Sequence, residues 1–152
     1  MVIWRTALYR LVRLYWRVFK PTVLGSRVIV ARGGQVLLVR LSYAKGWYLP
    51  GGGLKKHESF QQAALRELRE ECGLNAENAE LFGLYFSTRQ GKIDHVAIFT
   101  ITEFTKLEGS TEDPEISEMG FFDLLELPPD TTPATRRRIG EYLAGRPTSI
   151  EW

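Results

Sequence analysis

The sequence predicts an α/β fold, in which the strands of one sheet alternate with a few helices. Two observations lead to this prediction: short apolar segments bounded by turn residues recur along the chain, and two later segments carry helix start signals. With 152 residues, 44% of them hydrophobic and 25% charged, the chain has the size and composition of one soluble globular domain. No internal repeat or linker divides the sequence. We therefore expect one domain over residues 21–152, preceded by a helix over residues 1–20.

Five segments are predicted to be strands because each is rich in apolar residues and ends near turn residues. Gly33 and Gly34, between the first two segments, predict a hairpin. A last helix is expected to begin at Thr132-Pro133, a cap residue followed by proline, and to end near Leu143. The five predicted strands are Val28–Ala31, Val36–Leu41, Glu80–Ser87, His95–Phe104 and Ile116–Asp123. The segment Trp47–Leu49 is expected to be short and extended, leading into Pro50.

The best-marked helix follows Ser59, which is a favourable N-cap. Gln62, three residues later, completes a capping box, and Gly73 supplies a C-terminal stop. Leu68 and Cys72 fall on the side opposite to the acidic residues of this helix, so they can face a core.

The other side of this helix carries a cluster of carboxylates. Glu67, Glu70 and Glu71 are three and four residues apart, so they share one helix face. Like charges this close repel each other and would weaken a bare helix. A hard divalent cation, Mg²⁺ or Mn²⁺, would account for the cluster. A solvated acidic face is the simpler alternative.

The segment before the helix favours a binding site over a merely solvated face. Leu49–Gly53 is a glycine-rich loop that can bring bare backbone close to a ligand. Glu58 lies where this loop meets the helix, a place where an acid also interacts favourably with the helix dipole. We assign Gly52 and Gly53, together with the aromatic Tyr48 just before them, to substrate binding.

Residues 52–74 resemble the sequence box of the Nudix hydrolase family. The box reads glycine, five free positions, glutamate, seven free positions, Arg-Glu, an aliphatic residue, one free position, Glu-Glu, one free position, glycine and an aliphatic residue. Every fixed position is matched, by Gly52, Glu58, Arg66, Glu67, Leu68, Glu70, Glu71, Gly73 and Leu74. The resemblance covers roughly residues 25–145. It implies an α/β/α sandwich with a mixed sheet that cleaves the diphosphate of a nucleoside diphosphate linked to another group.

The resemblance also implies roles for the box residues. Divalent cations, Mg²⁺ or alternatively Mn²⁺, would be held by carboxylates and one backbone carbonyl and would neutralise phosphate oxygens. Arg66 would hold a glutamate in place, and Glu70, one helical turn on, is its candidate partner. The implied metal ligands are the Gly51 carbonyl, Glu58, Glu67, Glu70 and Glu71.

The general base stays open between two locations. Within the box, Glu67 or Glu70 could accept the proton of the attacking water. Many family members instead use a glutamate from another loop, and the acidic stretch over residues 112–118 resembles that loop. Glu115 is the first choice there. If this stretch is only a solvated loop, the base returns to the helix.

The box does not specify which nucleotide derivative is the substrate. A nucleoside triphosphate, giving a monophosphate and pyrophosphate, is slightly favoured because the single domain is small. The alternative is a non-catalytic Nudix module that senses a nucleotide or acts as a protein scaffold. No nucleic acid partner is expected, because the strands lack interleaved basic and aromatic residues.

Residues 1–20 predict a basic amphipathic helix that ends before Pro21. They carry a charge of +5 with no acid, which leaves −3 for the rest of a chain whose net charge is +2. Three roles stay open: packing on the domain or on a second subunit of a homodimer, contact with an anionic membrane surface, and an import presequence. The apolar stripe consists of Trp4, Leu8, Leu11, Tyr15 and Val18.

Cysteine content and hydropathy indicate the compartment. Cys72 is the one cysteine of the chain, so an internal disulfide framework is excluded and a reducing environment is suitable. The sequence lacks an uninterrupted apolar run of about 18 residues, so we do not expect a spanning helix. These features predict a cytoplasmic protein.

Overall fold

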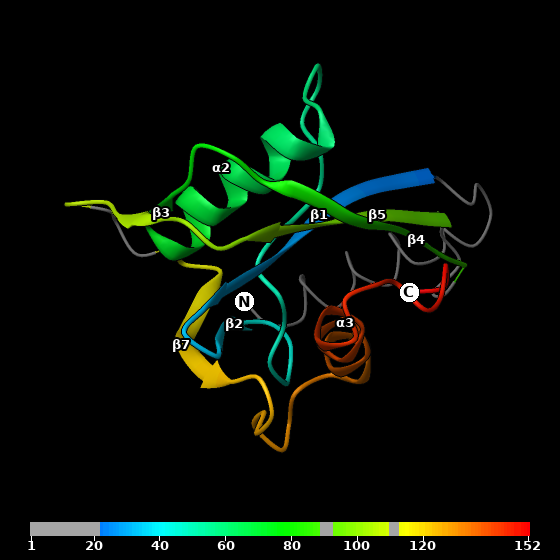
Figure 1. The fold of residues 1–152 in the computed structure, drawn as a ribbon. Coiled ribbons are helices and arrows are strands. Elements are labelled where there is room, and N and C mark those ends of the chain that lie inside the picture. Colours follow the sequence, from blue (N-terminus) through cyan, green and yellow to red (C-terminus); the bar gives the residue numbers. More distant parts are fainter. Residues whose placement is uncertain (1–21, 89–92, 110–112) are drawn as a thin grey trace, which may run out of the picture.

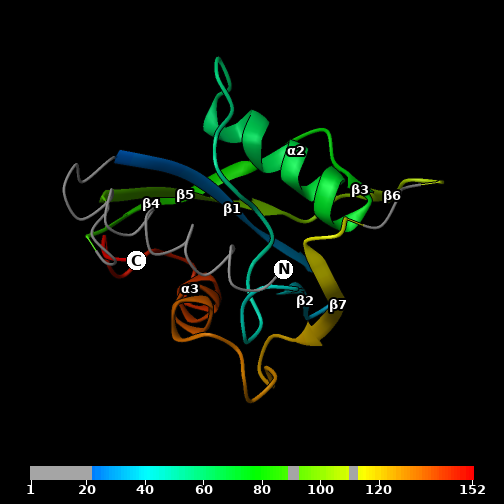
Figure 2. The same cartoon turned by 180° about the vertical axis from the view of Figure 1, so that it is seen from behind.

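A mixed five-stranded sheet with one helix packed on each face positions the site (Figure 1; seen from behind in Figure 2). The computed structural model of the chain describes residues 22–88, 93–109 and 113–152. The predicted α/β fold with a mixed sheet is confirmed. The predicted helix over residues 1–20 lies outside the described residues, as does Glu112 of the acidic stretch.

The strands follow the order β4-β5-β1-β2-β7 across the sheet. β1 runs parallel to β5, whereas the other neighbouring strands are antiparallel. Gly33 and Gly34 form the predicted hairpin turn with φ angles of +60° and +80°, which glycine adopts readily. The strands are β1 (Thr22–Arg32), β2 (Gln35–Leu41), β4 (Glu80–Ser87), β5 (Ile93–Ile101) and β7 (Ile116–Asp123), and a small second sheet pairs β3 (Leu74–Asn75) with β6 (Thr105–Lys106).

Strand boundaries differ from the prediction where pairing between distant segments decides them. β4 and β7 have the predicted bounds, but β1 begins at Thr22 rather than Val28, because its first half pairs with β5. β5 ends at Ile101, and the chain beyond it turns into β6 rather than continuing to Phe104. The segment 47–49 makes isolated bridges and is not a strand of the sheet.

Successive side chains of each strand point to opposite faces of the sheet, so the strands contribute to two hydrophobic cores. Val28 and Val30 of β1 face the core under helix α2 (Phe60–Cys72), whereas Ile29 faces the core under helix α3 (Pro133–Leu143). Leu68 and Cys72 are buried from the α2 side, as predicted. Neither of these two helices, within the described part of the chain, is long and apolar enough to cross a bilayer.

The caps that the sequence predicted are present at both helices. The Ser59 side chain accepts a hydrogen bond from the Gln62 N–H at 3.1 Å, and the Ser59 N–H donates to the Gln62 side chain at 2.9 Å. Gly73 ends α2 in the left-handed conformation, with a φ of 61°. Thr132 caps α3 ahead of Pro133. These caps fix where α2 begins, and thus where its acidic residues stand relative to the glycine loop.

Helix α3 also buries an ion pair that the sequence analysis did not predict. Arg138 and Glu141 are 1% and 4% exposed, and their side chains approach to 3.3 Å. The Tyr85 hydroxyl donates to Glu141 at 2.8 Å, and the Thr148 N–H and hydroxyl donate to its other oxygen at 3.1 and 2.8 Å. This cluster joins α3 to β4 and to the C-terminal segment.

Candidate active site

The glycine loop is held along the edge of β1 by backbone hydrogen bonds. The Ser26 N–H donates to the Gly52 carbonyl, and the Val28 N–H donates to the Pro50 carbonyl, each at 2.9 Å. The Leu54 N–H closes the series by donating to the Leu24 carbonyl at 3.1 Å. The loop is therefore an extension of the sheet, so its backbone has a fixed place beside α2.

Two positions in this loop require glycine because neighbouring groups lie too close for a side chain. Gly51 has a φ of +133°, and a Cβ there would run into the Ser26 carbonyl. A Cβ on Gly52 would lie 2.5 Å from a carboxylate oxygen of Glu67. The loop backbone and the acidic face of α2 are thus packed directly against each other.

Arg66 gathers the box carboxylates around one guanidinium. It donates to Glu58 through Nε and Nη2 at 2.7 and 2.9 Å, in the bidentate arrangement that arginine favours. Its Nη1 donates to Glu67 at 2.6 Å and to Glu70 at 2.9 Å. A further bond from Nη2 reaches the Gly53 carbonyl at 3.0 Å. The contact with Glu70 is the one that the sequence predicted.

Arg66 and Lys55 lower the pKa values of the Glu58 and Glu70 carboxyls. The Arg66 hydrogen bonds hold the pKa of Glu58 well below its ordinary range, at about 2. Lys55 donates through Nζ to Glu70 at 3.0 Å, and this bond, followed by that from Arg66, lowers the pKa of Glu70. The Lys55 N–H also donates to Glu58 at 2.8 Å. Glu58 and Glu70 are therefore ionised at neutral pH.

Glu71 is in a different environment from its neighbours. Burial raises the pKa of its carboxyl to about 7, with Glu67 and Asp113 adding to the effect. The Gly51 N–H, which donates to Glu71 at 2.7 Å, and the charge of Arg27 act in the opposite direction. A carboxylate this poorly solvated would gain from a nearby cation.

Arg27 is a site residue that the sequence analysis missed. Its Nη1 donates to the Leu49 carbonyl at 3.3 Å and to the Gly51 carbonyl, the backbone ligand implied by the resemblance. The available signal was its position, because Arg27 is the one charged residue in the otherwise uncharged stretch 22–31. The guanidinium stands beside both Gly51 and the Glu71 carboxylate that it influences.

The donor set fits a hard divalent cation. Glu67, Glu70, Glu71 and the Gly51 carbonyl offer only oxygen atoms, which Mg²⁺ and Mn²⁺ prefer. In the described residues these side chains do not converge as a ready ligand set, because Arg66 and Lys55 hold two of them. Both oxygens of Glu58 are bound in the same way. Metal binding would therefore compete with these cations for the glutamates.

The acidic stretch approaches the box from the start of β7. The Glu115 carbonyl accepts a hydrogen bond from the Ser42 N–H at 2.8 Å, and the Glu115 N–H donates to the Asp113 carboxylate at 2.8 Å. Asp113 is near enough to raise the pKa of Glu71, and the Glu115 side chain is exposed. The structure thus brings this loop to the box, with Asp113 as a second acid beside Glu115.

Most of the Tyr48 side chain has a structural role. Its ring packs against the core under α2, and its hydroxyl donates to the Lys45 carbonyl at 2.9 Å. A role in substrate binding, as the sequence suggested, would rest on the exposed part of the ring. Of the two glycines assigned with it, Gly52 accepts from Ser26 and Gly53 accepts from Arg66 through their carbonyls.

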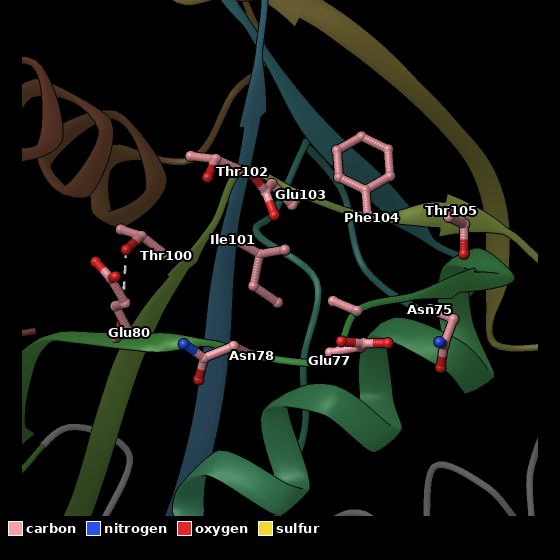
Figure 3. Close-up of a pocket in the computed structure, with 11 residues that line it drawn as sticks. Asn75, Glu77, Asn78, Glu80, Thr100, Ile101, Thr102, Glu103, Phe104 and Thr105 are labelled. Atoms are coloured by element: carbon pink, nitrogen blue, oxygen red, sulfur yellow. Dashed lines mark hydrogen bonds between the residues drawn. The ribbon is translucent and has the colours of Figure 1, made fainter.

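A cavity of about 530 Å³ lies at the end of β5, beside the residues that follow the box (Figure 3). One wall is the segment between β3 and β4, and the other is the segment from β5 to β6. No box residue lines it, so the clustered carboxylates, rather than this hollow, define the candidate chemistry. Its lining residues are Asn75–Asn78, Glu80 and Thr100–Thr105.

A family model for the NUDIX domain matches residues 21–143. This match covers most of the chain and includes the box and the loop that meets it. The chain therefore belongs to the Nudix family, as the resemblance of residues 52–74 implied.

Two curated relatives describe what the chain is similar to. An RNA pyrophosphohydrolase of Xanthomonas oryzae pv. oryzae (strain MAFF 311018) is 42% identical over 65 residues, which cover 43% of this chain and 31% of the relative. The chain thus spans about a third of that protein's length. A Bacillus subtilis (strain 168) protein named "Putative 8-oxo-dGTP diphosphatase" is 28% identical over 118 residues, 78% of this chain and 77% of the relative.

Solved structures agree with the fold. A MutT NUDIX hydrolase from Burkholderia pseudomallei superposes with a TM-score of 0.69 at 27% identity, covering 78% of this chain and 96% of that one. A MutT protein from Bacillus halodurans gives a TM-score of 0.65 at 26% identity, with 85% and 84% covered. The sheet with a helix on each face is therefore the Nudix fold.

Proposed function

We propose that this protein is a divalent-metal-dependent hydrolase that uses water to cleave the diphosphate linkage of a nucleoside diphosphate derivative. The observation that carries the proposal is the packing of Glu67 and Glu71 against the fixed glycine loop, with Arg66 joining that loop to Glu67 and Glu70 of the helix. A purely solvated acidic face would not need this loop, and its Glu71 would not be partly buried.

The metal in this proposal is Mg²⁺, with Mn²⁺ as the alternative, held by Glu67, Glu70, Glu71 and the Gly51 carbonyl. When bound, such a cation neutralises phosphate oxygens and makes water a better nucleophile. Arg66 orients the glutamates and keeps Glu58 charged beside them. Arg27 donates to the Gly51 carbonyl, so a metal would compete with its guanidinium for that oxygen.

Glu115 is our proposed general base, which takes the proton of the attacking water at a carboxylate oxygen. The support is its exposure: Glu115 is exposed on a loop that meets the box, whereas Glu67 and Glu70 are engaged by Arg66 and Lys55. A carboxylate committed to a guanidinium is a poorer proton acceptor, because the ion pair favours its charged form.

For the substrate we favour a nucleoside triphosphate, cleaved to a monophosphate and pyrophosphate. The Bacillus subtilis relative, which aligns over most of both chains, is named for a substrate of this class. RNA, named for the Xanthomonas relative, is the second candidate, supported by the higher identity over a shorter stretch. We further propose that the protein is cytoplasmic and forms a homodimer. Residues 1–20 would pack on the domain or lie on a membrane surface.

The test is a panel of nucleoside triphosphates, nucleotide sugars and 5′-triphosphorylated RNA, incubated with Mg²⁺ and resolved by product mass. We expect release of pyrophosphate from a triphosphate, and no release in excess chelator. Glu77→Gln, which removes a carboxylate from the cavity at the end of β5, is the matched control and should retain activity. Binding of a nucleotide without turnover of any substrate would favour the alternative, a non-catalytic sensing module.

A further inference from the structure

Lys55 lies between the glycine loop and α2, and its side chain reaches the acidic face of the helix. The ammonium donates to one carboxylate oxygen of Glu70 at 3.0 Å. The backbone of Lys55 is anchored as well, because its N–H donates to the Glu58 carboxylate at 2.8 Å and its carbonyl accepts from the Glu58 N–H at 3.3 Å. The flexible side chain of Lys55 therefore starts from a fixed point beside the proposed metal ligands.

The two cations on Glu70 differ in how firmly they are held. Arg66 donates to the second carboxylate oxygen at 2.9 Å, and it also donates to two further carboxylates and to the Gly53 carbonyl. The Arg66 side chain is only 16% exposed. The Lys55 side chain is 61% exposed, and its ammonium makes one hydrogen bond among the residues that the structure describes. An exposed ion pair of this kind contributes little to stability, so Lys55 is the cation that a metal can replace.

A metal cation bound at Glu70 would leave the Lys55 ammonium without its acid and beside another positive charge. Like charges repel, so the ammonium would turn to the nearest anion. In the proposed reaction that anion is the substrate, because the metal binds phosphate oxygens at the same carboxylates. A lysine ammonium suits this contact, since it is a point charge with three donors on a flexible stem.

We propose that Lys55 is a substrate-binding residue that exchanges partners, so that a divalent cation displaces it from Glu70 and its ammonium then donates to a phosphate oxygen of the substrate. The inference rests on the metal and the phosphate substrate of the proposed function. It gives Lys55 two effects of opposite sign. In the metal-free protein Lys55 opposes metal binding, whereas in the metal-loaded protein it strengthens substrate binding.

Lys56 offers a matched control for the charge. It is the next residue, it is exposed, and its side chain has no hydrogen bond or ion pair within the described part of the chain. Lys55→Met and Lys56→Met remove the same charge and keep an aliphatic side chain of similar length. A difference between the two variants therefore reports the contact with Glu70 rather than net charge. Both should melt at the wild-type temperature.

The metal half of the exchange is measured without turnover, by titrating Mn²⁺ and following the free ion by electron paramagnetic resonance. Lys55→Met should bind Mn²⁺ about 3-fold more tightly than wild type, a change of the size that exposed ion pairs produce. Lys56→Met should bind it as wild type does. In a Glu70→Gln background, Lys55→Met should bring no such gain, because its acid partner is gone. Unchanged affinity in Lys55→Met, or a gain that persists without Glu70, would overturn the exchange.

The substrate half uses inorganic triphosphate, which carries the phosphate groups without a base, titrated by calorimetry in saturating Mg²⁺. Lys55→Met should bind it about 10-fold more weakly than wild type, the effect of losing one hydrogen bond between charged groups. Lys56→Met should stay close to wild type. Equal losses in the two variants, or no loss in Lys55→Met, would overturn the contact with phosphate.

The exchange and the proposed hydrolysis can fail separately. A wild type that hydrolyses a substrate with Mg²⁺, while Lys55→Met resembles Lys56→Met in both titrations, would sink the exchange and leave the proposed function standing. Both shifts in Lys55→Met, together with a wild type that turns over no substrate of the panel, would overturn hydrolysis and support the exchange. A wild type that binds neither Mn²⁺ nor triphosphate would overturn both.

Discussion

At the residue scale, one guanidinium holds the acidic cluster together. Arg66 contacts Glu58, Glu67 and Glu70, so charges that would repel each other on a bare helix are compensated from within the box. Glu71 alone lacks such a partner, and its carboxylate depends on Gly51 and Arg27. The site therefore combines three well-paired carboxylates with one that is poorly stabilised.

This contrast predicts the behaviour of Glu71→Gln. Loss of a metal ligand should reduce hydrolysis on the order of 10³-fold. The metal-free variant should nevertheless melt no lower than wild type at about pH 8. The pKa of Glu71 is raised from an ordinary 4.5 to about 7 in the fold, so its cost to stability accumulates as pH rises from about 4.5 to about 7 and is fully present at pH 8, and glutamine avoids it. Turnover assays and thermal melts with chelator check both parts. Full activity of the variant would refute the metal assignment.

Glu115→Gln tests the base at the same scale. If Glu115 accepts the proton, turnover should fall about 10²-fold or more, the usual range for general acid–base catalysis. Steady-state kinetics on the purified variant give the answer. A change of only a few-fold would mean that the loop is merely solvated, and Glu67 and Glu70 would then be the candidates.

At the scale of elements, the site depends on how tightly the glycine loop meets α2. Gly52→Ala would place a Cβ 2.5 Å from the Glu67 carboxylate, so one of the two must move. We expect a loss of activity of about 10-fold or more, the effect that small misplacements have on catalysis. The measurement is kcat with saturating Mg²⁺.

Gly140→Ala is the matched control for that change. Gly140 lies inside α3 with open space around it, so alanine fits and should stabilise the helix by about 1 kcal/mol without changing kcat. Equal activities of the two alanine variants would show that contact between loop and helix does not matter for the chemistry.

At the scale of the whole molecule, the buried Arg138–Glu141 pair of α3 links stability to pH. Burial alone would raise the pKa of Glu141, but hydrogen bonds from Tyr85 and Thr148, together with Arg138, outweigh it and hold the pKa below its ordinary value. The stability that Glu141 contributes is therefore present above about pH 4.5 and is lost as pH falls through the lowered pKa.

Glu141→Gln should remove this contribution. We expect it to destabilise the protein on the order of 3 kcal/mol at neutral pH, since Arg138 loses its buried counter-charge. The difference from wild type should shrink below about pH 4.5. Denaturant unfolding at several pH values measures it. A difference that stays constant into the acid range would show that Glu141 does not titrate between the folded and unfolded states.

The sequence by itself determined the features that depend on neighbouring residues. The box, the Ser59 cap, the Gly33-Gly34 turn and the bounds of β4 and β7 each follow from local patterns of charge, capping or alternation. The family followed from the fixed spacing of the box.

The tertiary structure alone decided which distant groups meet. Pairing with β5 extended β1 to Thr22, and the backbone bonds between β1 and the glycine loop placed Arg27 against Gly51. Ser42 and Glu115 meet at the end of a ladder although they are 73 positions apart in the sequence. Such contacts depend on strand order and register, which a single sequence does not encode in any local pattern. The carboxylates could thus be read from the sequence, but the groups that position them could not.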